Sequence, residues 1–189
     1  MITIGKKAFV SALFFAASHV SGFAQTMNPS PSEAFSGFRD YELKALVVSE
    51  AVAADKAKVE VVRTVQTHFD RIVSPVVAGW KDKRIDETSE TLMIEPLVES
   101  IKKVGGATRF FAGALAGNSY VVVTLKITAQ PEGRVIAQPY FYQQAAAYGG
   151  AWTVGATDND MLRRIASLVA DYLERNYSQP VGGPTGRPN

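Results

Sequence analysis

Residues 120–129 read YVVVTLKITA, and this stretch decides the fold prediction. Large apolar residues recur at every second position: Val121, Val123, Leu125 and Ile127. Thr124, Lys126 and Thr128 lie between them. This alternation predicts a β-strand with one buried face and one solvent-facing side. The turn-forming residues QPEG follow at 130–133, and residues 134–147 are predicted to return as a second strand of a hairpin.

Two stretches with helical spacing lie on either side of this hairpin. The first, residues 54–73, carries an apolar stripe of Val62, Val65, Phe69, Ile72 and Val73. Pro75 should end or kink that helix, because proline lacks the N–H and clashes with the preceding turn. The second, residues 158–177, carries a stripe of Met161, Leu162, Ile165, Leu168, Val169, Tyr172 and Leu173. Both stripes need a partner layer, which a sheet supplies.

Two further strands complete the predicted domain. Residues 41–49 alternate as a first strand, and residues 92–104 form an edge or bulged strand because they contain Pro96. The order is therefore β-α-β-β-β-α. We predict one α+β domain over residues 40–177, with a mixed or antiparallel sheet of about four strands and two helices packed on one face. Residues 25–39 are expected to be a flexible leader, and residues 178–189, which hold three Pro and three Gly, a disordered tail.

The N-terminus has the features of a secretory signal peptide. Lys6 and Lys7 precede an apolar run over residues 8–18, and Gly22-Phe-Ala24 resembles a cleavage site. We expect cleavage near Ala24 and a periplasmic or secreted protein; a retained N-terminal anchor is the alternative, although the run is about half the ~20 residues of a spanning helix. Cleavage takes two lysines from the 20 basic residues and none of the 18 acidic residues, which leaves zero net charge. A neutral chain without basic blocks argues against nucleic-acid binding.

The residue inventory gives little support to catalysis. The chain has no Cys, which excludes disulfides, thiolate metal sites and a lipid-modified N-terminal cysteine. After cleavage the only His is His68, which we expect on a helix surface. No motif indicates a metal or a cofactor, and we predict that the protein is not an enzyme. A hydrolase using carboxylates such as Glu95, Glu99 or Asp158 is the remaining catalytic alternative.

Two segments are candidates for binding. The first is RFFAGALAG at 109–117, where Gly113 and Gly117 have the G-x-x-x-G spacing of close packing. Its candidate partner-contact residues are Arg109, Phe110, Phe111, Gly113 and Gly117. The partner would be another envelope protein or a second copy, with peripheral membrane contact also possible; a tight connection packed under the sheet is the structural alternative.

The second candidate is a set of aromatic residues that could form a stacking platform for a sugar or another small molecule: Tyr140, Tyr142, Tyr148 and Trp152. Aromatic rings present flat apolar faces to such ligands. The same residues also suit a half-buried strand whose phenol oxygens reach water, and this is the structural alternative.

The chain resembles a family of bacterial envelope proteins, the domain-of-unknown-function 4410 group, over about residues 40–176. The resemblance is carried by Arg109-x-x-Ala112-Gly-Ala-Leu-Ala-Gly117, a strand ending near Thr128, Gly133-Arg-Val-Ile-Ala137 and a helix ending Ala170-Asp-Tyr-Leu173. It implies an exported protein, often a lipoprotein, without an assigned activity. This chain departs from the lipoprotein members because it lacks the boundary cysteine. The pattern is also similar to small α/β domains of envelope assembly proteins such as the curli secretion-channel lipoprotein, an analogy of fold alone.

Overall fold

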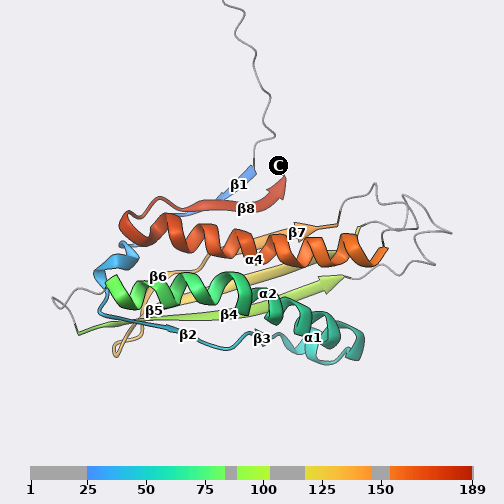
Figure 1. The fold of residues 1–189 in the computed structure, drawn as a ribbon, viewed down its shortest axis with the longest axis horizontal. Helices are drawn as coiled ribbons and strands as arrows, with labels where there is room; N and C mark the ends of the chain where they lie inside the picture. Colours follow the sequence, from blue (N-terminus) through green and yellow to red (C-terminus); the bar gives the residue numbers. More distant parts are fainter. Residues whose placement is uncertain (1–24, 84–88, 103–117, 146–153, 189) are drawn as a thin grey trace, which may run out of the picture.

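The computed structural model describes residues 25–83, 89–102, 118–145 and 154–188. It confirms the predicted α+β class, with two long helices on one face of a six-stranded mixed sheet (Figure 1). The sheet strands are β2 (Asp40–Leu43), β3 (Val47–Val48), β4 (Thr91–Lys102), β5 (Tyr120–Gln130), β6 (Arg134–Ala137) and β7 (Tyr140–Gln144). The long helices are α2 (Lys56–Trp80) and α4 (Val154–Ser178). Short helical turns are η1 (Phe35–Gly37), α1 (Glu50–Ala53) and η2 (Lys81–Lys83).

The six strands occupy four positions across the sheet, because two pairs of short strands share a position. β2 and β3 both pair in parallel with β4 on one side. β4 pairs antiparallel with β5, and both β6 and β7 pair antiparallel with β5 on its other side. The predicted hairpin after residue 129 is present. The predicted single strands over 41–49 and 134–147 are each two strands with a break.

β4 is a central strand whose register with β5 shifts between Val98 and Ser100, so the bulged alternative predicted for residues 92–104 agrees with the structure and the edge alternative is wrong. Its Pro96 lies opposite Leu125 of β5. The Leu125 N–H donates away from β4, to the Pro139 carbonyl at 3.0 Å, so the nitrogen of Pro96 faces β2 and β3. The pairing along that side stops after Lys44, whose N–H donates to the Ile94 carbonyl at 2.9 Å, and resumes at Val47. A central strand therefore accommodates proline because its missing N–H faces the break.

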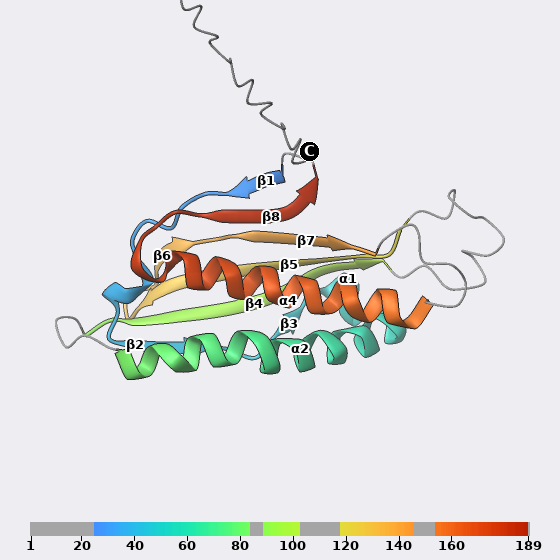
Figure 2. The same cartoon turned by 45° about the horizontal axis from the view of Figure 1, so that its top comes forward.

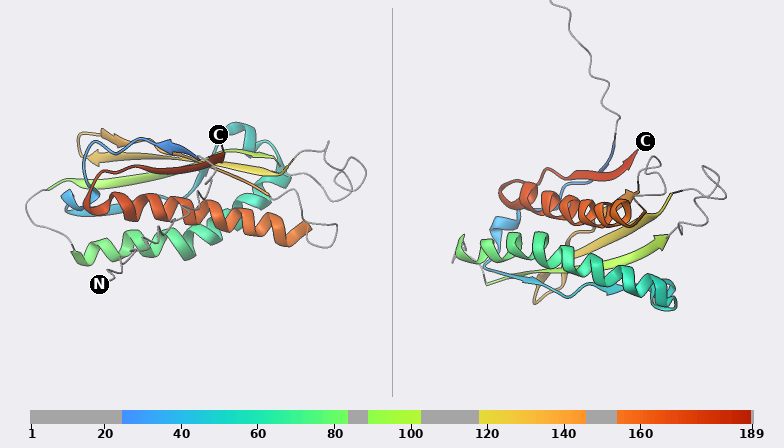
Figure 3. Two further views of the ribbon diagram at one scale, coloured as in Figure 1. Left: turned by 90° about the horizontal axis from the view of Figure 1, so that it is seen from above. Right: turned by 45° about the vertical axis from the view of Figure 1, so that its right-hand side comes forward.

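The two helices lie side by side on one face of the sheet and run in the same direction (Figures 2 and 3). α2 continues through Pro75 as far as Trp80, so the alternative that Pro75 ends the helix is wrong. Trp80 is buried and stacks on Tyr177 at 5.1 Å between ring centroids, and it meets Tyr41 edge-on at 5.2 Å. Pro75 itself is exposed. Burial of the last turn against α4 and the sheet compensates for the hydrogen bond that the proline removes.

Residues 25–28 and 183–188 are strands, where the sequence analysis expected a flexible leader and a disordered tail. β1 (Gln25–Asn28) pairs antiparallel with β8 (Gly183–Pro188) in a two-stranded ribbon beyond β7 (Figure 2). The leader protects the outer edge of the sheet. The side chain of Asn28 bonds both the N–H and the carbonyl of Tyr140 at 2.8 Å, and the Ser32 N–H donates to the Ile136 carbonyl. Covering an edge in this way blocks unwanted strand pairing.

The tail packs because its glycines fit where other residues do not. Gly182 and Gly186 have φ values of +74° and +78°, in the left-handed region that favours glycine. A Cβ at Gly186 would collide with the Tyr142 carbonyl and lie 2.5 Å from Leu168 Cδ1. The buried side chain of Asn176 then holds the tail on α4, because its oxygen accepts from the N–H groups of residues 181 and 182, each at 2.8 Å.

Candidate contact surface on the sheet

The face of the sheet opposite α2 and α4, here called the helix-free face, is the main candidate surface (Figure 3). Side chains of β4 and β5 alternate between the two faces, and those toward the helices, such as Ile94 and Leu125, are fully buried. The strand register places one row of four side chains across the middle of the helix-free face: Val47, Leu97, Thr124 and Tyr140. The neighbouring row contains Glu95 and Lys126.

A hollow of about 500 Å³ lies at this level of the helix-free face. Its lining residues are Val47, Glu95, Leu97, Thr124, Leu125, Lys126 and Gln138. The hollow arises because both outer strand positions break at the same height. The break between β2 and β3 faces Pro96, and the break between β6 and β7 falls at residues 138–139, beside Leu125. A continuous strand at either position would fill part of this space.

Glu95 and Lys126 give the hollow its polar character. Lys126 Nζ lies 3.8 Å from Glu95 Oε2, within ion-pair range but beyond a hydrogen bond. That carboxylate oxygen is buried and accepts no hydrogen bond from any described residue. The rest of the pair is accessible, because the Lys126 and Glu95 side chains are 57% and 37% exposed. The hollow therefore presents one positive and one negative side chain to a partner chain or a polar ligand.

The aromatic platform is formed in part. Tyr140 and Tyr142 are half-buried on β7, and Tyr142 lies 5.8 Å from Tyr120 between ring centroids. The Tyr142 hydroxyl donates to Gln144 Oε1 at 3.0 Å. Burial raises the pKa of Tyr142, so its phenol remains a neutral donor. Tyr148 and Trp152, the other two predicted members, lie outside the described residues.

The predicted partner-contact residues Arg109, Phe110, Phe111, Gly113 and Gly117 also lie outside the described residues, as does the Asp158 side chain. Of the proposed hydrolytic carboxylates, Glu95 and Glu99 are both on β4. Four residues of strand separate them by about 13 Å, beyond the separation at which paired carboxylates act as acid and base.

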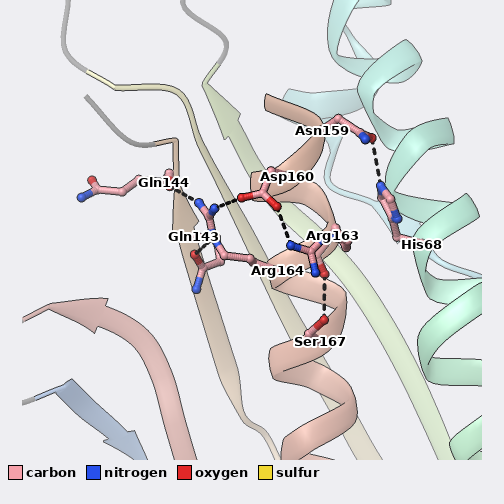
Figure 4. Close-up of polar contacts among 8 residues, drawn as sticks. All are labelled: His68, Gln143, Gln144, Asn159, Asp160, Arg163, Arg164 and Ser167. Carbon is pink, nitrogen blue, oxygen red and sulfur yellow. Dashed lines mark hydrogen bonds and ion pairs between the residues drawn. The ribbon is translucent and has the colours of Figure 1, made fainter. Parts of the chain in front are cut away.

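A polar cluster joins the start of α4 to β7 and α2 (Figure 4). The Arg164 guanidinium bonds Gln143 Oε1 at 3.2 Å, the Gln144 carbonyl at 2.9 Å and the Asp160 carboxylate. A hydrogen bond from Arg163 is the main cause that lowers the pKa of Asp160, which keeps this carboxylate ionised. The polar groups of the cluster thus bond to one another, and they fix the end of β7 on α4. We therefore assign the cluster a structural role.

His68 is buried, and the prediction of a surface histidine is wrong. Only 6% of the residue is exposed, and its Nε2 lies 3.0 Å from Asn159 Oδ1 at the start of α4 (Figure 4). The helical stripe of α2 places His68 at the margin of the apolar face, and α4 covers that margin. The packing of a helix some 90 residues later in the chain is not visible in the local pattern.

Glu95 was expected only as a possible catalytic carboxylate, and its pairing with Lys126 was not predicted. The alternation of residues 120–129 placed Lys126 on the polar side of its strand, which was a partial signal. The pairing depends on the register between β4 and β5, which joins segments 31 residues apart. Among the described residues, no three His, Asp or Glu side chains gather to hold a metal ion. No helix in the described part of the chain is long and apolar enough to cross a membrane.

Neither a family model nor a curated protein sequence matches the chain, so membership of the domain-of-unknown-function 4410 group stays a prediction. The solved structures that the chain is similar to include a point variant of the PelC dodecamer from Paraburkholderia phytofirmans, at 14% identity and a TM-score of 0.41, covering 76% of this chain and 94% of that chain. A Xanthomonas campestris protein of the DUF330 family model is similar at 11% identity and a TM-score of 0.38, covering 78% of this chain and 91% of that chain. At these values the similarities say nothing about what this chain binds.

Proposed function

We propose that this chain is an exported, non-enzymatic envelope protein that acts through protein–protein contact or self-association, using the helix-free face. The observation that carries the proposal is the hollow at the centre of that face, which is lined by the partly exposed ion pair of Glu95 and Lys126. Leu97 and Val47 supply apolar surface beside it, and Val47 is 56% exposed. Apolar side chains around a polar centre are suited to a specific contact.

The two edges of the sheet are the alternative locations for a contact, and both are less suitable. Asn28 and Ser32 already bond the outer edge of β6 and β7. The opposite edge, formed by β2 and β3, is short and broken, and its Glu42 and Lys44 are exposed charges that form an ion pair at 2.5 Å. Charged and interrupted edges pair poorly with other strands. The helix-free face is therefore the better contact surface among the described parts of the chain.

Cysteine cross-linking tests this proposal cleanly, because the chain has no cysteine of its own. Thr124→Cys places a thiol at the centre of the helix-free face, and Arg71→Cys places one on the exposed side of α2. A short thiol-reactive cross-linker is applied to cells of the native host that export each variant, and the adducts are sized by mass spectrometry. We expect a discrete adduct from Thr124→Cys and none from Arg71→Cys.

The two possible partners give different adduct masses. Twice the chain mass indicates self-association, and any other discrete mass that depends on the cysteine at 124 indicates a second protein. Equal adducts from both variants, or none from either, would contradict a contact role for the helix-free face.

A glycan- or small-molecule-binding role is the second candidate, favoured by the Tyr120–Tyr142 ring pair on the same face. Faces of aromatic rings stack on sugars, and the Glu95 carboxylate could accept a sugar hydroxyl. Calorimetric titration with cell-wall fragments tests this role. Binding that is lost in Tyr142→Ala would support it, and the absence of heat at millimolar fragment would remove it.

A further inference from the structure

We infer that the helix-free face pairs with the same face of a second copy, about a two-fold axis that runs along the strands between β4 and β5. This inference rests on the proposed function and names its partner. This axis stacks β4 of each copy over β5 of the other. Because the axis is parallel to the strands, equivalent residues of the two copies lie at the same position along the strand direction. Such an isologous contact is the commonest form of self-association.

Charge complementarity supports this axis. Glu95 and Lys126 lie opposite each other on β4 and β5, so the two-fold places each Glu95 over Lys126 of the second copy. Each Glu95 then faces the Lys126 of the other copy, which gives two pairs of opposite charges across the axis. Both side chains are partly exposed, Lys126 to 57% and Glu95 to 37%, so a second copy can reach them. The structure thus shows a charge pair that the two-fold matches with the opposite charges of a second copy.

The shapes of the side chains agree with the same axis. Across the next row the order is Val47, Leu97, Thr124 and Tyr140. The two-fold places the large Leu97 over the small Thr124 of the second copy, and the protruding Val47 over Tyr140. Large side chains that face small ones allow two sheets to interdigitate at the usual spacing of about 10 Å.

The available area is sufficient for a stable pair. Four strand positions at about 4.8 Å spacing and the 12 residues of β4 at about 3.3 Å each span roughly 750 Å². A standard interface buries about 800 Å² on each partner. A face of this size supports a dimer only when its centre is complementary, which makes the central Glu95 and Lys126 the decisive test positions.

The inference is tested by reversing the charge at each of the two positions and then mixing the two variants. The full chain, exported with its own N-terminal segment and purified, is measured by sedimentation as wild type, Glu95→Lys and Lys126→Glu. We expect a wild-type dimer, and at least about tenfold weaker self-association of each single variant, since each gives like charges across the axis. An equimolar mixture of the two variants should restore the dimer, because the lysine introduced at 95 then faces the glutamate introduced at 126. Circular dichroism checks that each variant is folded.

The outcomes separate this inference from the proposed function. A wild-type chain that remains monomeric at millimolar concentration overturns the self-pairing, and so does a dimer whose strength the reversals leave unchanged. In either case the proposed function still stands if Thr124→Cys gives a discrete adduct with a different protein. The proposed function fails only when the cross-linking shows no contact specific to the helix-free face.

Discussion

Replacing Gly186 with alanine should destabilise the protein far more than the same change at Gly133. Both glycines have positive φ, +78° and +72° respectively. A Cβ at Gly133 meets nothing within 4 Å, whereas one at Gly186 collides with the Tyr142 carbonyl and lies 2.8 Å from Gln143 Nε2. Comparing the two alanine variants therefore separates the backbone cost of positive φ from the cost of overpacking the contact between the tail and β7.

The expected losses follow from these two contributions. Positive φ costs an alanine about 1 kcal/mol, so Gly133→Ala should lower the free energy of unfolding by about that amount. Overpacking adds about 1–3 kcal/mol, so Gly186→Ala should lose about 2–4 kcal/mol. At about 2–4 °C of melting temperature per kcal/mol for a chain of this size, the difference between the variants is readily measured.

Urea unfolding at 25 °C of the wild type and the two variants provides the assay, with hydrogen exchange of residues 183–188 as a second readout. The midpoint should fall further in Gly186→Ala, and the β8 amides should exchange faster only in that variant. Equal losses in the two variants, together with rapid β8 exchange already in the wild type, would refute the assignment of the tail to an ordered ribbon.

Three further predictions concern the buried core and the polar clusters. Asn176→Ala should cost about 2–3 kcal/mol in urea unfolding, because two N–H groups of the tail lose the acceptor that lies 2.8 Å from each; a loss below about 0.5 kcal/mol would contradict this role. Trp80→Ala should cost about 3–5 kcal/mol by the same assay, since it removes the aromatic contact that holds the last turn of α2; an unchanged midpoint would contradict the packing of that turn against Tyr177. Arg163→Gln should raise the pKa of Asp160 toward its ordinary 3.8 in an NMR carboxyl titration. Because the folded-state pKa of Asp160 is lowered, its stabilising contribution is fully present above the ordinary value of 3.8 and is lost as the pH falls from there through the lowered pKa. An unchanged pKa in the variant would contradict the role of Arg163.

Local periodicity predicted the elements whose burial repeats regularly. The two-residue alternation over 120–129 identified β5 and its polar side, and the apolar stripes identified α2 and α4, because each element buries one continuous face against the other layer. The α+β class followed from their order. These are properties of short segments, and they can be recognised without knowing which other segment of the chain packs against them.

The features that the sequence did not reveal depend on contacts between distant segments. Glycine and proline in the tail indicated disorder, but Gly182 and Gly186 are required by positive φ and by the close approach of Asn28 and Tyr142. Pro96 indicated an edge, but its nitrogen faces a break in the neighbouring strand. The Glu95–Lys126 pair of the candidate surface exists only once β4 and β5 are in register.

Thiol accessibility in intact cells measures whether a partner covers the helix-free face. Thr124→Cys and Arg71→Cys are labelled with a maleimide reagent in cells of the native host and again as dilute purified protein. We expect the thiol at 124 to be protected in cells and reactive after dilution, whereas the thiol at 71 should react equally in both. Full labelling of the thiol at 124 in cells would contradict a covered face.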